Sequence, residues 1–408
     1  MREHFRQPFY RYVGAFLYLA SAGPGLTAED YSEVPRNTSR FGFQLLARLI
    51  DGEPRKRNFI ISPVSVELAL AMTYAGADGA TAAAIAKTIG WNGIPRERIL
   101  EAESALQNAL AQAGQDVALR IANAIWVDRR VELRSQFHQE IKDVFSSEVF
   151  SRPFQDPGIV RDVNGWVNEQ TAGKISELIA KPPPPPLLLA DAVYFKAPWR
   201  SRFEPHASTS QPFYLEDKTR VDAVMMHQSA SFPYLKSDAF EAVRLPYAGD
   251  RFGLVLLLPA GGLSTKDLVQ QLGERSWPEL QNQFQPTACD LAIPRFKFTY
   301  ETALDQPLQE LGMGQAFDPR SADFRRMLAG TAPPLFIGSV VHKTYLRVDE
   351  AGSEAAAATA VGIRASALPM RKGIRIVFDR PFVLAITDQR TQAILFSGVL
   401  GNPEDAKL

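Results

Sequence analysis

The first half of the chain has the periodicity of helices. Apolar residues recur three and four positions apart over 38–50, 62–75, 80–89, 96–113, 136–145 and 159–179, which predicts a helix in each range. The range 62–75 is apolar on most sides, so we expect a buried helix there. Ser62 is the expected N-cap and Pro63 the expected first residue, because a serine hydroxyl caps free N–H groups and a proline lacks only an N–H that would stay unpaired.

The second half has the pattern of strands. Short apolar or β-branched runs predict strands over 187–195, 252–258, 291–300, 335–348, 374–378, 382–386 and 392–398, after one earlier strand over 117–127. Helices come first and strands later, without a regular alternation of the two. This order indicates an α+β fold with mixed or antiparallel sheets.

The composition argues against several kinds of partner and site. The 45 basic and 45 acidic residues cancel, so we expect no attraction to nucleic acid or to an anionic membrane. The single cysteine, Cys289, excludes an internal disulfide, and the five histidines do not have the spacing of metal ligands. The sequence contains no G-x-x-x-x-G-K-[ST], G-x-S-x-G or H-E-x-x-H motif. We therefore expect no metal, no cofactor and no enzymatic activity.

The N-terminus has the order of a secretory signal. Three arginines precede an apolar stretch at 13–20, and Ala20-Ser21-Ala22 then offers a cleavage site. We expect residues 1–22 to be a signal peptide and the protein to be secreted; the alternative is an N-terminal arm that is not removed. Residues 23–36 are the expected arm and 37–408 a single domain.

Five prolines at 182–186 predict a rigid loop, with an exposed proline-rich docking motif as the alternative.

The segment from Glu350 to Lys372 is the most unusual part of the chain. About twenty residues there lie between two predicted strands, and a loop that long in a compact domain is usually functional or disordered. Its alanines could form a helix. If the segment is extended, however, every second residue from Ser353 to Ile363 lies on one face, and all of these residues are small or apolar. The segment could therefore become a strand that slides between existing strands.

Motifs along the chain carry a family resemblance. NFIISPVS at 58–65, NAIWVD at 123–128, YFKAPW at 194–199 and FDRPF at 378–382, together with the segment at 350–372, resemble an inhibitory serpin. The resemblance covers about residues 37–403. It implies helices packed around three mixed or antiparallel sheets, with an exposed reactive-centre loop at about 353–373. It also implies a serine-type endopeptidase inhibitor whose cleaved loop inserts into the main sheet and traps the protease irreversibly, a known form of strand addition.

The resemblance assigns roles to residues. The usual spacing from Glu350 places the reactive bond at Ser366-Ala367, which favours an elastase-like target because the specificity pocket of elastase is small. Arg364 or Arg371 would favour a trypsin-like enzyme and Leu368 or Met370 a chymotrypsin-like one. The expected hinge is Glu350, Gly352, Ser353, Glu354, Ala355, Ala356, Ala357, Ala358 and Thr359, with Ser353 the first residue to insert.

Two further groups are expected to control opening of the sheet. The breach, where insertion begins, contains Arg295 and Trp199, and Arg295 should pair with Glu350. The shutter is the hydrogen-bonded cluster of Ser62, Ser65, Asn164, Asp191 and His342. Asp191 stands where the family usually has asparagine, and an ionised Asp191 would favour the imidazolium form of His342.

We expect a monomer whose partner is a serine protease. The alternatives are a non-inhibitory serpin that acts as a carrier or chaperone, and a hydrolase with a dispersed triad.

Overall fold

The computed structural model describes residues 33–53, 57–330, 334–353 and 373–406. Its helices are α1 (Glu33–Gly52), α2 (Pro63–Gly76), α3 (Gly79–Ile89), α4 (Arg96–Ala111), α5 (Ser135–Phe145), α6 (Gly158–Gln170), α7 (Thr265–Glu274), α8 (Trp277–Gln281), α9 (Asp305–Leu308) and α10 (Gly314–Phe317). Short turns of helix also occur at Pro205–Ala207, Gln309–Met313 and Glu404–Ala406. As predicted, Ser62 caps α2 by accepting a hydrogen bond from the backbone N–H of Ser65, and α2 is buried along its whole length.

The strands form two sheets among the described residues. The six-stranded sheet has the order β10-β11-β4-β2-β3, and β12 pairs with β4. These strands are β2 (Ala118–Asp128), β3 (Glu148–Arg152), β4 (Leu187–Pro198), β10 (Phe296–Ala303), β11 (Ser339–Val348) and β12 (Gly352–Ser353). The nine-stranded sheet has the order β1-β15-β14-β8-β7-β6-β9-β13, and β5 pairs with β6. Its strands are β1 (Asn58–Ile61), β5 (Thr209–Tyr214), β6 (Arg220–Lys236), β7 (Phe240–Pro246), β8 (Phe252–Pro259), β9 (Gln285–Pro294), β13 (Ile374–Val377), β14 (Phe382–Asp388) and β15 (Ile394–Leu400).

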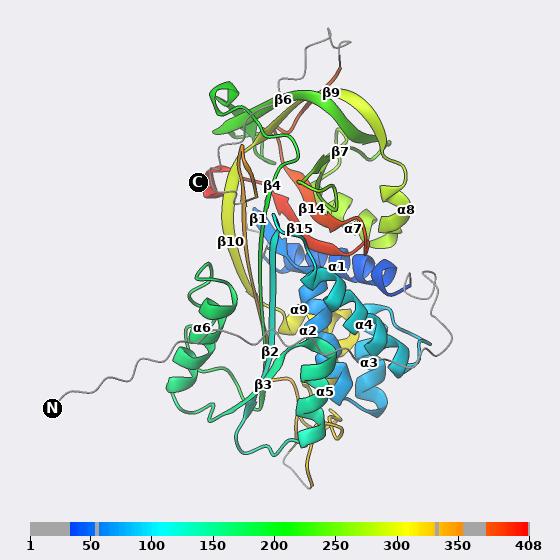
Figure 1. The fold of residues 1–408 in the computed structure, drawn as a ribbon, viewed down its shortest axis with the longest axis vertical. Helices are drawn as coiled ribbons and strands as arrows, with labels where there is room; N and C mark the ends of the chain where they lie inside the picture. The colour runs from blue at the N-terminus through cyan, green and yellow to red at the C-terminus, as the bar shows by residue number, and fades with distance from the viewer. Residues whose placement is uncertain (1–32, 54–56, 331–333, 354–372, 407–408) are drawn as a thin grey trace, which may run out of the picture.

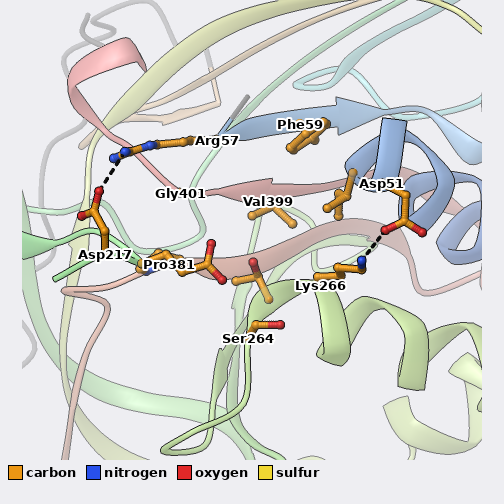
Figure 2. Close-up of a pocket in the computed structure, with 12 residues that line it drawn as sticks. Asp51, Arg57, Phe59, Asp217, Ser264, Lys266, Pro381, Val399 and Gly401 are labelled. Atoms are coloured by element: carbon orange, nitrogen blue, oxygen red, sulfur yellow. Dashed lines mark hydrogen bonds and ion pairs between the residues drawn. The ribbon is translucent and has the colours of Figure 1, made fainter. Parts of the chain in front are cut away.

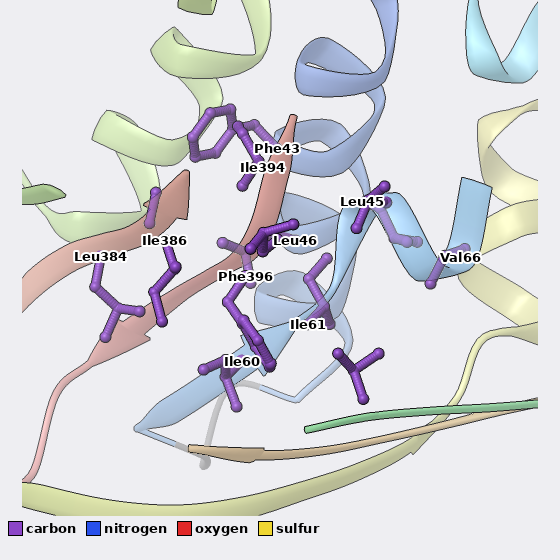
Figure 3. Packing of buried hydrophobic residues seen from close by; sticks show 14 of the residues in the cluster. Phe43, Leu45, Leu46, Ile60, Ile61, Val66, Leu384, Ile386, Ile394 and Phe396 are labelled. Carbon is purple, nitrogen blue, oxygen red and sulfur yellow. The ribbon is translucent and has the colours of Figure 1, made fainter. Parts of the chain in front are cut away.

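The central strands of the six-stranded sheet are buried on both faces, whereas β10 and β3 at its edges have exposed residues. Helix α6 covers one face and helices α2 to α5 lie on the other (Figure 1). Alternate residues of β2 follow this arrangement, because Ala124 and Trp126 pack under α6 while Ile125 and Val127 join the larger core on the opposite side. That larger core continues between α1, β1, β14 and β15, where Leu46, Ile61 and Phe396 meet (Figure 3). The α+β prediction is confirmed.

Helices pack around mixed sheets, as expected. The 17-residue β6 pairs with β5, β7 and β9, so two of the three expected sheets form one continuous sheet. Two predictions about single elements were wrong. The helix over 159–179 ends at Gln170, since Ala172 and Gly173 have left-handed backbone angles. The strand over 291–300 is two strands of different sheets, β9 and β10, separated at Arg295.

Two acidic side chains lie in the core between helices. Glu67 of α2 and Glu103 of α4 are both fully buried, and the Thr38 hydroxyl donates a hydrogen bond to Glu67 Oε1. Burial raises the pKa of Glu103 to about 8. Burial, and then the charge of Glu103, raise the pKa of Glu67 well above its ordinary value. The native protein therefore holds protons that the unfolded chain releases above a pH of about 4.3.

We expect the native state to lose stability as the pH rises. A carboxyl group whose pKa is raised by folding contributes its full stability below its unfolded pKa and loses it as the pH approaches its folded pKa, here between about 4.3 and about 8. The urea midpoint should fall across this range. Glu103→Gln should flatten the dependence, whereas Glu101→Gln, on the exposed side of the same helix, should not. Equal pH dependence in the wild type and Glu103→Gln would contradict this assignment.

Candidate functional site

The site is the seam between β4 and β11. The two strands run parallel and pair from Ser339 opposite Leu188 to Tyr345 opposite Tyr194. Both strands continue beyond the last pair, and we call this the upper end of the seam. There β12 pairs with β4 in antiparallel register, with Ser353 opposite Ala197. The chain has therefore already entered the sheet by two residues at the upper end.

Gly352 makes the entry of β12 possible. Its φ is +150°, a backbone conformation that residues other than glycine rarely adopt. A Cβ atom there would lie 2.2 Å from the carbonyl oxygen of Ala197 and 2.7 Å from Cα of Pro198. The chain can turn from β11 into β12 at this close approach only because position 352 has no side chain.

Ser353 is anchored by aromatic residues under the upper end. Its side chain is fully buried, and its Oγ lies 2.6 Å from the hydroxyl oxygen of Tyr247. The Tyr247 ring stacks on Trp199 with a centroid distance of 4.5 Å, and the indole Nε1 of Trp199 donates to the carbonyl oxygen of Asp349 at 2.8 Å. Burial raises the pKa of Tyr247, so its hydroxyl keeps its proton. Trp199 thus lies at the upper end of the seam, in contact with the chain that leads into β12.

The expected pair of Glu350 and Arg295 is present. Arg295 Nη1 lies 3.7 Å from Glu350 Oε1, with the arginine side chain 40% exposed. An ion pair this long, with its arginine exposed to solvent, stabilises little. Glu350 is held more firmly by the Ser208 hydroxyl, which donates to Oε1 at 2.7 Å, and by the Phe203 N–H, which donates to its carbonyl oxygen at 3.0 Å.

A second cluster crosses the middle of the seam below β12. Asp191 of β4 lies opposite His342 of β11, and both are fully buried. His342 Nδ1 lies 3.1 Å from Asp191 Oδ2, and the Ser65 hydroxyl donates to Asp191 Oδ1 at 2.7 Å. Asn123 Nδ2 donates to the carbonyl oxygen of Ser65 at 3.1 Å, and the Ser62 N–H donates to His342 Nε2 at 3.0 Å. We call these five residues the central cluster; it joins β2, β4 and β11 to the start of α2.

One predicted member lies elsewhere, and one member was missed. The hydrogen bonds of Asn164 go to the backbone of Leu178 and Ile179, where they hold the chain that leaves α6. Asn123 takes its place in the central cluster. The signal for Asn123 was its position as a polar residue in the apolar strand pattern over 117–127. The other predicted members, Ser62, Ser65, Asp191 and His342, do lie together.

The geometry of His342 opposes the imidazolium form that the sequence suggested. Nε2 accepts a hydrogen bond from the Ser62 N–H, so it cannot carry a proton of its own without setting two N–H groups against each other. The proton of the neutral ring is therefore on Nδ1, which faces Asp191 Oδ2. The contact between Nδ1 and Asp191 Oδ2 does not have the geometry of a hydrogen bond.

His342→Ala should destabilise the native protein by about 1–3 kcal/mol, because buried polar groups of the central cluster are left without a partner. The Ser62 N–H also loses its acceptor. A matched control is His138→Ala on the exposed face of α5, which should change stability by less than about 0.5 kcal/mol. The measurement is the urea midpoint of each variant. Equal midpoints would show that the central cluster does not stabilise the sheet.

The remaining predicted site residues lie outside the described part of the chain. These are Glu354, Ala355, Ala356, Ala357, Ala358 and Thr359 of the hinge and the reactive bond Ser366-Ala367. Within the described residues, no group of three or more histidine, cysteine, aspartate or glutamate residues could hold a metal ion. No helix of that part of the chain has the length and apolar character needed to cross a bilayer.

A separate cavity of about 490 Å³ opens between α1, α7 and the ends of β1 and β15 (Figure 2). Phe59 and Val399 line it with apolar surface. Both basic residues of the cavity form ion pairs: Arg57 pairs with Asp217 at 3.0 Å, and Lys266 pairs with Asp51 at 2.5 Å. None of the residues that line the cavity belongs to β4 or β11.

Comparison with known proteins agrees with this geometry. The profile of the family described as Serpin (serine protease inhibitor) matches residues 36–403. A serpin-like protein of Thermococcus kodakarensis is 35% identical over 85% of this chain and 81% of its own length. The leukocyte elastase inhibitor of Bos taurus is 34% identical over 90% of this chain and 98% of its own length.

Solved structures share the fold. The native state of Tengpin, a thermophilic serpin, superposes with a TM-score of 0.83 at 29% identity, covering 94% of this chain and 96% of that one. Human thyroxine-binding globulin in complex with thyroxine also gives 0.83, at 26% identity, covering 92% and 99%. With the family profile spanning most of its length and the same fold in both neighbours, this chain belongs to the serpin family.

Proposed function

We propose that the protein is an irreversible suicide-substrate inhibitor of serine proteases. A target protease cleaves the loop after Ser353 and forms an acyl-enzyme with it. The freed strand then enters the seam between β4 and β11 and carries the protease with it. The observation that supports this most is the position of β12, since Ser353 is already buried in the upper end of the seam.

The geometry of the seam favours continued insertion. β4 and β11 are parallel, and β12 is antiparallel to β4. A strand that continues β12 downwards would therefore be antiparallel to both neighbours, and it would replace one parallel ladder by two antiparallel ones. About ten new hydrogen bonds of ~0.5–1.5 kcal/mol each would form. Ser366 follows Ser353 by 13 residues, which in an extended strand is about 43 Å, and this is the distance that the protease would travel.

The proposed target is an elastase-like protease, with the reactive bond at Ser366-Ala367. Support comes from the small side chain of Ser366, which suits a small specificity pocket, and from the similarity to a leukocyte elastase inhibitor. Trypsin-like and chymotrypsin-like proteases are the alternatives. We propose further that the protein is secreted and acts as a monomer; the support is the signal-like order of residues 1–22.

The test is a gel of the protein mixed with elastase, trypsin and chymotrypsin in turn. We expect a covalent band that survives SDS with elastase. Ser366→Arg should transfer the band to trypsin, while Ser321→Arg, at an exposed serine in another loop, should not. Clean cleavage without a covalent band for every protease would contradict the inhibitory function.

A carrier function is the second candidate, and the cavity between α1 and α7 favours it. A neighbour with the same fold is a thyroxine-binding protein. Equilibrium binding of thyroxine, measured by quenching of intrinsic tryptophan fluorescence, tests this candidate. Saturable binding that Val399→Trp abolishes would support it, and no binding would exclude thyroxine as the cargo.

A further inference from the structure

The five prolines at 182–186 lie at the lower end of the seam. β4 begins directly after them at Leu187, β2 ends beside them at Asp128, and β11 begins at Ser339. The Asp128 N–H donates to the carbonyl oxygen of Pro186 at 2.8 Å. The Gly338 N–H donates to the carbonyl oxygen of Leu187, also at 2.8 Å. The chain around the prolines is thus hydrogen-bonded to the strands on both sides of β4.

Backbone oxygens of the proline segment crowd against Gly338. A Cβ atom at Gly338 would lie 2.4 Å from the carbonyl oxygen of Pro184 and 2.9 Å from that of Pro185. Gly338 precedes the first paired residue of β11, so these carbonyls approach the β11 side of the seam. Pro183 and Pro186 are buried, while Pro182, Pro184 and Pro185 are exposed. The run is therefore packed into the sheet and is not presented as a continuous docking surface.

We propose that the segment Pro182–Pro186, which we call the proline clasp, locks the lower end of the seam. The clasp keeps β4 and β11 together at Gly338, so the sheet opens from the upper end only. This inference rests on the proposed function, because it concerns the seam that the loop is proposed to enter.

The physical reason is stiffness. Each proline fixes its own φ and restricts the residue before it, so the segment cannot bend away from Gly338 as an ordinary loop could. Opening the lower seam must break the hydrogen bond from Gly338 to Leu187 and displace the whole rigid segment at once. The clasp therefore opposes entry of the uncleaved loop along the full seam, which would leave the protein inactive and heat-resistant.

The test follows intact protein, without protease, at a temperature below its melting point. The quantity measured is the first-order rate at which a heat-resistant fraction appears. The double variant Pro184→Ala and Pro185→Ala should convert about fivefold to thirtyfold faster, because it restores freedom to two residues at the contact with Gly338. Pro182→Ala is the matched control. It makes the same chemical change at an exposed proline outside that contact, and it should convert at the wild-type rate.

Gly338→Ala tests the clasp from the other side. Its methyl group would meet the carbonyl oxygen of Pro184 and push the segment off the seam, so it should also speed conversion. A merely destabilised variant would melt earlier and form no heat-resistant fraction. Wild-type rates in both the double variant and Gly338→Ala, or an equal acceleration in Pro182→Ala, would overturn the clasp.

The two proposals can fail separately. If wild-type protein nicked in the loop gains no heat resistance, the insertion mechanism is wrong whatever the variants do. If nicked wild type gains heat resistance while the double variant and Gly338→Ala convert like the wild type, only the clasp is wrong.

Discussion

We expect Ser353→Arg to turn the proposed inhibitor into a substrate. Ser353 is fully buried in the upper end of the seam, with its Oγ 2.6 Å from the Tyr247 hydroxyl. A guanidinium group cannot be placed there without burying an unpaired charge or expelling β12 from the sheet, and either costs several kcal/mol. Insertion is then slower than hydrolysis of the acyl-enzyme. Since ~1.4 kcal/mol is tenfold in rate, the number of inhibitor molecules consumed per trapped protease should rise at least about tenfold.

The control for this variant is Ser353→Thr, which keeps a hydroxyl group near Tyr247 and adds one methyl group. It should inhibit at nearly the wild-type stoichiometry. The first cleavage by protease should be as fast in Ser353→Arg as in the wild type, because Ser366 is 13 residues away. Wild-type stoichiometry in Ser353→Arg would show that insertion does not begin at Ser353.

Cleavage of the loop will raise the melting temperature. The inserted strand adds about 5–15 kcal/mol from some ten ladder hydrogen bonds. Globular proteins gain ~2.1 cal/mol/K of entropy per residue on unfolding, so for a chain of this length the rise should be about 6–18 °C. The proposed mechanism requires a native state that is a kinetic trap and lies above the filled sheet in free energy.

The measurement compares intact protein with protein nicked between residues 363 and 370. The matched control is Ser353→Arg nicked in the same way, which should show little of the rise because its strand cannot enter the seam. Equal melting temperatures for intact and nicked wild type would rule out a metastable native state.

Local chemistry explains which parts of this structure could be predicted from the sequence. Ser62 and Pro63 predict the start of α2 correctly because a cap depends on neighbours along the chain. The family resemblance predicts the pair of Glu350 and Arg295 because it fixes residues that are distant in sequence. Ser353 was expected to be the first residue to insert, and it is buried in the seam of the folded protein.

The errors arise where distant strands decide the outcome. Asn123 joins the central cluster through β2, whereas Asn164 holds the chain after α6. A polar residue in the apolar strand pattern marks Asn123 as unusual, but only the pairing of the strands shows that it lies beside Ser65. β6 was missed because its 17 residues face partly buried surroundings on both sides and show no clean alternation. The sequence predicts a rigid loop at the proline run, but the contact of this loop with Gly338 is visible only in the folded structure.

Amide hydrogen exchange in the six-stranded sheet, before and after cleavage of the loop, measures insertion itself. In the intact protein the β4–β11 ladder ends at Tyr194 and Tyr345, so the backbone amides of Leu346 to Val348 that face the seam lie beyond its last pair. Insertion of a strand between β4 and β11 predicts that these amides exchange far more slowly after cleavage, while those of β8 in the other sheet do not change. Unchanged exchange at 346–348 in protein with a fully cleaved loop would show that the loop does not enter the seam, and the proposed mechanism would be wrong.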